Sequence, residues 1–290
     1  MENNQPLINP SPESNPPPEI KPAEPQPVSP PPPPVFPPPV LTPEAPPEKK
    51  PWGAWPTIGF GAVILLVFFV AQNLVSFIFV LSNPNVITNT TALANLSTNG
   101  LLVSIAVLVS AVAGFVMTVV FIRLRKNIGV FEYLGLHRPK ARTIFIVLGI
   151  SLGLLLVVTY IESLFGQGAA DNSNFTSDAY RTAVYPALLW IAVVIFAPVF
   201  EESFFRGFLF AGLVKSRLGA VGTILLTAVI FGVLHFQYNW AGMGEVIILG
   251  IVLGTVRLKS GSLFASIAVH SFWNFIATLV TALTFYGILH

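Results

Sequence analysis

Long runs of apolar residues, separated by short polar loops, organise the chain beyond about residue 50. A run of about 20 apolar residues is long enough for a helix to cross the hydrocarbon core of a bilayer. The runs cover residues 57–81, 101–124, 143–165, 184–213, 221–236, 244–256 and 263–288. The last of them fits either one long helix or a helix followed by a short re-entrant piece. The pattern predicts an all-α, polytopic membrane protein with about seven or eight transmembrane helices.

Residues 1–50 differ sharply from the rest, because clusters of proline alternate there with glutamate. A segment of this kind cannot bury a hydrophobic core, and proline favours the extended polyproline II conformation. We therefore expect a disordered, Pro-rich tail that serves as a spacer and carries no catalytic residue.

The composition is that of an integral membrane protein, because soluble domains contain about 25% charged residues. Hydrophobic residues make up 53% of the chain and charged residues only 10%, with a mean hydropathy of +0.74. The absence of cysteine excludes disulfides, thiolate nucleophiles and Cys-zinc sites. A net charge of +2 without a basic tract or a phosphate-binding loop argues against nucleic acid as a partner.

Basic residues predict the orientation in the membrane. Lys49 and Lys50, the cluster in 123–142, the pair in 215–217 and the pair in 257–259 fall on alternate loops, whereas the opposite loops hold a single arginine. Cytoplasmic loops are enriched in Lys and Arg. The N-terminus is therefore expected in the cytoplasm; the side of the C-terminus depends on whether there are seven or eight spans.

Glu201, Glu202 and Arg206 interrupt the fourth apolar run. Charged side chains at membrane depth cost at least ~2.5 kcal/mol each and usually serve a function. Glu202 and Arg206 are four residues apart, which suits an ion pair on one face of a helix. Glu201 points about 100° away from Glu202. One arginine does not neutralise both carboxylates, so Glu201 is the candidate general base.

His235, His270 and Asn274 are further polar residues in apolar runs. A lone histidine in such a run is more often a satisfied core residue, and His270 with Asn274 could serve as interhelical polar contacts. Glu201, His235 and His270 nevertheless fall on three different predicted helices. We therefore interpret the three, with Asn274, as parts of one site.

Two mechanisms of amide hydrolysis fit these groups. In the first, Glu201 deprotonates a water that His235 helps to position, while His270 and Asn274 donate to the developing oxyanion. In the second, Glu201, His235 and His270 bind a zinc ion. There is no His-Glu-x-x-His motif, and an amide such as that of Asn274 is a better oxyanion donor than zinc ligand. The residues favour the first mechanism, without a cofactor.

The polar residues fall into three motifs, Glu-Glu-x-x-x-Arg at 201–206, Phe-x-x-x-His at 231–235 and His-x-x-x-Asn at 270–274. These three motifs, in this order, resemble those of the type II CAAX prenyl endopeptidases and their bacterial relatives, the CPBP or Abi family. The stretch 259–263, Lys-Ser-Gly-Ser-Leu, is similar to the family's Thr-Gly-Ser-Leu turn.

The resemblance implies an all-helical intramembrane endopeptidase. Glu201 would activate water with His235 as its partner, His270 and Asn274 would form the oxyanion site, and Glu202 and Arg206 would support them. The family is often described as metalloproteases and has also been viewed as metal-free. On this basis the chain divides into the tail (1–50), N-terminal transmembrane helices (51–182) and a CPBP-type catalytic domain (183–290).

The function expected is therefore cleavage of a membrane-associated peptide, with a prenylated CAAX protein as the substrate that the resemblance suggests. The resemblance also implies a multi-pass protein of a bacterial plasma membrane. Two alternatives stay open: a transporter or proton relay, since membrane Glu and His residues mark such relays, and a scaffold that binds peptides without cleaving them. A transporter would favour internal repeats, and the sequence contains none that we detect.

Overall fold

The computed structural model describes residues 50–165 and 172–289, with the side chains of 161–174 left aside. Apart from Lys50, the Pro-rich tail expected over residues 1–50 lies outside the described residues. All regular structure in the described ranges is helical, which confirms the predicted all-α class.

Within these ranges, six helices are long and apolar enough to cross a membrane. A further apolar helix, α11, is shorter, with 15 residues. Each predicted run therefore forms a helix, and the last run is one helix up to Phe285 rather than a helix with a re-entrant piece. The long helices are α1 (Ala54–Ser82), α4 (Gly100–Arg123), α6 (Ala141–Phe165), a composite helix Pro186–Leu213, α12 (Trp240–Ser260) and α13 (Leu263–Phe285), and α11 is Gly219–Val233.

Short helices fill the connections. Three follow α1, namely α2 (Asn85–Thr88), α3 (Thr90–Ala94) and the 3-10 turn η1 (Leu96–Thr98). The other two are α5 (Val130–Leu134), between α4 and α6, and α7 (Asn172–Arg181), which precedes the composite helix.

The composite helix changes its winding within a continuous rod. It runs through α8 (Pro186–Trp190), π-helical η2 (Ile191–Phe196), α9 (Ala197–Glu202), π-helical η3 (Ser203–Leu209) and α10 (Phe210–Leu213). π-Helical turns are rare and occur mostly as single-turn bulges, often at functional sites. Here they flank the α-helical turn that ends in Glu201 and Glu202.

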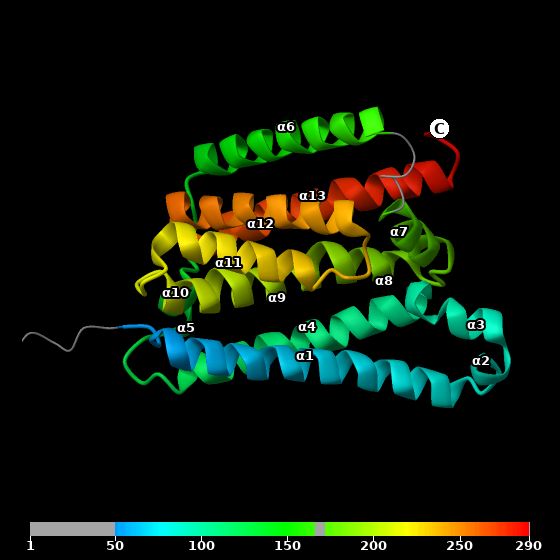
Figure 1. The fold of residues 1–290 in the computed structure, drawn as a ribbon, viewed down its shortest axis with the longest axis horizontal. Helices are drawn as coiled ribbons and strands as arrows, with labels where there is room; N and C mark the ends of the chain where they lie inside the picture. Colours follow the sequence, from blue (N-terminus) through cyan, green and yellow to red (C-terminus); the bar gives the residue numbers. More distant parts are fainter. Residues whose placement is uncertain (1–49, 166–171, 290) are drawn as a thin grey trace, which may run out of the picture. The chain divides into compact units, whose positions relative to one another are not determined.

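The composite helix lies between two helix pairs, α1 with α4 on one side and α11 with α12 on the other (Figure 1). Phe200 of α9 stacks on Phe68 of α1, with ring centroids 4.9 Å apart. It also packs directly on the backbone of α4, because a Cβ at Gly114 would lie 2.3 Å from its ring. Aromatic packing and a glycine thus hold the carboxylate-bearing turn in place.

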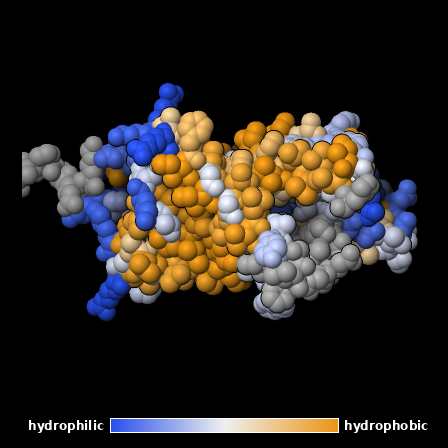
Figure 2. Space-filling view, turned by 90° about the horizontal axis from the view of Figure 1, so that it is seen from above, coloured by the Kyte–Doolittle hydropathy of each residue, from blue (hydrophilic) through white to orange (hydrophobic). Residues whose placement is uncertain are grey.

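The remaining long helices, α13 and α6, lie on the same side of the composite helix as α12 (Figure 1). α13 packs on α12, and α6 packs on both through Ile144, Val147 and Leu148. Large apolar side chains remain exposed along the outside, among them Leu66, Val70 and Ile150. Figure 2 shows this hydrophobic surface along the middle of the molecule, with hydrophilic residues gathered toward its ends. Such a distribution is expected for helices that face lipid.

Candidate functional site

A buried ion pair lies at the centre of the site. Nη1 of Arg206 donates to Oε1 of Glu202 at 2.9 Å, and neither side chain is exposed. This is the pair expected from the four-residue spacing. Nη2 of Arg206 also donates to the carbonyl oxygen of Gly250 in α12, at 2.9 Å. The pair therefore ties the composite helix to α12.

His270 of α13 joins this pair. Its Nδ1 lies 2.9 Å from the same Oε1 of Glu202, and its side chain is only 3% exposed. A carboxylate paired with an arginine accepts hydrogen bonds, so Nδ1 of His270 carries the hydrogen. The other ring nitrogen, Nε2, consequently faces away from Glu202, and Oε2 of Glu201 lies 3.6 Å from it.

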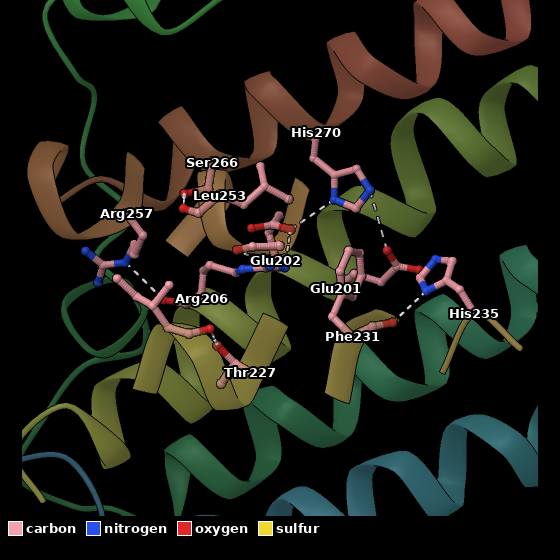
Figure 3. A network of polar contacts seen from close by, with 12 residues as sticks. Glu201, Glu202, Arg206, Thr227, Phe231, His235, Leu253, Arg257, Ser266 and His270 are labelled. Carbon is pink, nitrogen blue, oxygen red and sulfur yellow. Dashed lines mark hydrogen bonds and ion pairs between the residues drawn. The ribbon is translucent and has the colours of Figure 1, made fainter. Parts of the chain in front are cut away.

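Glu201 occupies a different environment from its neighbour. Its side chain is 18% exposed, whereas that of Glu202 is fully buried. Figure 3 shows the carboxylate of Glu201 between the imidazoles of His270 and His235, which come from different parts of the fold. Two adjacent residues thus divide their tasks: Glu202 is fixed by a cation and a histidine, and Glu201 reaches a more open position.

His235 lies just beyond the end of α11, not within the helix as the apolar run predicted. Its Nδ1 lies 2.7 Å from the carbonyl oxygen of Phe231, a carbonyl left without a helical partner at the end of α11. A carbonyl oxygen can only accept, so Nδ1 donates, and in the neutral imidazole Nε2 is free to accept. The helix end therefore fixes which nitrogen of His235 can bind a water molecule.

Asn274 has a structural contact that its expected role did not include. Its Nδ2 donates to the carbonyl oxygen of Val193 in η2, at 2.8 Å. In π-helical winding this carbonyl would accept from the residue five positions later, which is Pro198 and has no N–H. Asn274 supplies the missing donor and fastens α13 to the π turn. One amide hydrogen remains for the oxyanion role.

Arg257 of α12 supports the second π-helical segment. Its Nε donates to the carbonyl oxygen of Arg206 at 3.0 Å, and its guanidinium also reaches the carbonyl oxygens of Leu134 and Gly261. One side chain therefore links η3, α5 and the end of α12. The guanidinium of Arg206 itself lies over the ring of Phe231, 4.7 Å from the centroid.

The positions of the acidic and histidine side chains bear on the zinc alternative. In the described part of the chain, no three His, Cys, Asp or Glu side chains are placed to hold a metal ion. The zinc alternative built on Glu201, His235 and His270, and with it the term metalloprotease, is not supported by this arrangement.

Comparison with protein families agrees with the three motifs. Residues 183–276 match the model of the type II CAAX prenyl endopeptidase Rce1-like family. This region is Rce1-like. It begins just before the composite helix and extends into α13, so it includes all six candidate residues. A search of curated proteins found no match, and neither did a search of solved structures.

The Rce1-like match confirms the resemblance inferred from the sequence and supports a protease role in a membrane. It gives no support to a transporter or to a scaffold without activity.

Within the Rce1-like region, sequence reasoning missed Tyr238 as a neighbour of the site. Its ring stacks on that of His235, with centroids 6.0 Å apart and planes at 21°, and Phe175 of α7 packs on its edge. A turn closed by the hydrogen bond from the N–H of Tyr238 to the carbonyl oxygen of His235, at 2.9 Å, brings the two rings together, and the spacing of three residues was the available signal. The links from Arg257 and from the carbonyl of Gly250 had no signal of this kind.

Proposed function

We propose that the protein is an intramembrane endopeptidase in which Glu201 activates the attacking water. The observation that carries this proposal is the unequal environment of the two adjacent carboxylates. Glu202 is buried and bonded to Arg206 and His270, whereas Glu201 is partly exposed and lies between two imidazoles. A general base must be positioned by its neighbours and still be reachable by substrate and water.

The proposed reaction conserves protons. Glu201 takes a proton from a water that Nε2 of His235 helps to orient, and the hydroxide oxygen bonds to the scissile carbonyl carbon. The carbonyl oxygen becomes an oxyanion, which accepts hydrogen bonds from Nε2–H of a protonated His270 and from the free amide hydrogen of Asn274. Glu201 then returns its proton to the amine as the C–N bond breaks.

Glu202 and Arg206 are positioning residues in this proposal. The bond from Nδ1 of His270 to Glu202 orients the ring, and the Glu202 carboxylate stabilises positive charge on it. Arg206 offsets the charge of Glu202, so that two carboxylates can lie side by side in a medium of low dielectric.

The substrate class proposed is a membrane-associated peptide, with a lipidated, CAAX-type protein suggested by the family's description. The distribution of Lys and Arg supports a cytoplasmic N-terminus. The division into N-terminal helices (51–182) and a catalytic domain (183–290) is consistent with an Rce1-like match confined to the second part.

The test uses the full chain in nanodiscs and a farnesylated peptide ending in a CAAX sequence. Wild type should cleave this peptide, and Glu201→Gln should lower kcat by about 10²–10⁴-fold, the usual contribution of general acid–base catalysis. Glu132→Gln, on the exposed face of α5, is the matched control and should keep wild-type activity.

Full activity in Glu201→Gln would refute the proposed mechanism. Proton flux without cleavage would support a relay instead, and peptide binding without cleavage would support a scaffold. Stoichiometric zinc that tracks activity through chelation and reconstitution would overturn the metal-free route.

A further inference from the structure

A cavity separate from the catalytic residues lies between the start of α6 and the last turns of α12. Its volume is about 620 Å³, and none of the six site residues lines it. α12 separates it from the site, because Gly250 and Arg257 contact Arg206 while Ile251 and Thr255 line the cavity. Pockets of about 300–1,000 Å³ are typical of sites that bind small molecules.

The deeper walls of the cavity are apolar and belong to two membrane-crossing helices. Val147 and Ile150 come from α6, and Ile251 and Val252 from α12. Ile150 is 62% exposed, so this wall continues onto the outer surface of the molecule. An aliphatic chain can therefore enter from the surrounding bilayer and remain in contact with hydrocarbon along its length.

The end of the cavity at the membrane boundary is basic. Arg138 and Lys140 precede α6, and Lys259 lies in the last turn of α12. All three side chains are exposed, and within the part of the chain that the structure describes none forms an ion pair. The described residues that line the cavity include no Asp or Glu.

We propose that this cavity binds one anionic phospholipid, with its phosphate at Arg138, Lys140 and Lys259 and an acyl chain between α6 and α12. Basic residues at the end of apolar transmembrane walls fit a headgroup that is negative and a tail that is hydrocarbon. A soluble anion would leave the apolar part unfilled, and a neutral lipid would leave three cations without a partner. The proposal is independent of the reaction at Glu201.

Native mass spectrometry of the full chain in a neutral detergent tests this binding. Wild type should bind one dioleoyl phosphatidylglycerol in preference to dioleoyl phosphatidylcholine. Arg138→Gln/Lys140→Gln/Lys259→Gln should weaken that binding about a hundredfold, because each basic residue near an anionic lipid contributes roughly fivefold. Ile251→Trp, which fills the apolar part and keeps every charge, should also reduce occupancy by at least about tenfold.

The control variant is Arg123→Gln/Lys126→Gln/Arg142→Gln, which removes the same charge near the same ends of the helices, from residues that do not line the cavity. It should retain wild-type binding. Equal loss in both triple variants, or wild-type binding in the first, would overturn the site. If excess glycerol 3-phosphate displaced bound lipid as effectively as added lipid does, the site would be one for a free phosphate and the lipid assignment would be overturned.

Thermal unfolding of each variant verifies its fold, and Ile251→Trp tests the site if the basic variant does not fold.

Discussion

Replacing Arg206 by methionine isolates the electrostatic role of the buried pair. Methionine keeps much of the volume and the apolar contacts with Phe231, but it removes the guanidinium. Glu202 would then hold a negative charge, fully buried, with His270 as its remaining hydrogen-bond partner among the described residues.

The expected cost follows from the burial. Removing one partner of a fully buried ion pair destabilises a protein by about 3–5 kcal/mol, because the other charge stays desolvated. The lost hydrogen bond to the carbonyl oxygen of Gly250 adds about 1 kcal/mol. Glu202→Gln/Arg206→Met removes both charges, and we expect it to recover at least about 2 kcal/mol of the loss.

The free energy of unfolding is measured by SDS titration in dodecyl maltoside micelles. Arg181→Met is the matched control, since its pair with Asp178 is also within one helix but its side chain is 68% exposed. We expect a change of no more than about 1 kcal/mol there. If the double variant lost as much unfolding free energy as Glu202→Gln and Arg206→Met lose in sum, the reasoning from an uncompensated charge would be wrong.

Three further predictions use other contacts. Gly250→Ala should lower the unfolding free energy by about 1–3 kcal/mol, because its Cβ would lie 2.9 Å from the backbone of Ala228. Gly244→Ala in the same helix, with nothing within 4 Å of its Cβ, should not. Asn274→Leu should lower both cleavage and stability, the latter by about 1–3 kcal/mol, since it strands the carbonyl of Val193; lost cleavage at unchanged stability would contradict the contact. Burial raises the pKa of Tyr133, in α5 outside the membrane-crossing helices, from 10.0 to about 12. The unfolded chain releases this proton at lower pH than the folded protein does. The unfolding free energy should therefore fall by about 1.4 kcal/mol per pH unit between pH 10.0 and about pH 12, and Tyr133→Phe should abolish this pH dependence.

The helices themselves were predictable, because apolar runs of membrane length leave the backbone few options in lipid. The pairing of Glu202 with Arg206 was also predictable, because a spacing of four brings two side chains together on any helical surface. Both inferences depend on residues close in the sequence, for which local geometry is sufficient.

The bond between His270 and Glu202 shows where this reasoning ends. The two residues are 68 positions apart, and the apolar runs contain no information on which turns of two helices meet. His270 was expected at the oxyanion, at a zinc ion or in an interhelical polar contact, but nothing in the sequence indicated Glu202 as the partner of one of its nitrogens. His235 was expected inside a helix and lies beyond its end, because hydropathy does not mark where winding stops.

The two π-helical segments in the described residues give the composite helix a rotational phase that an α-helix of equal length would not have. An i→i+5 turn encloses one more residue than an i→i+4 turn, which makes it equivalent to a single-residue insertion. If residues 191–196 wound as an α-helix of the same length, everything beyond them would turn by about 100° relative to the residues before them. The hydropathy profile would be unchanged, yet Glu201 would no longer face α13. For this stretch, the winding of the helix carries as much functional information as the residue types.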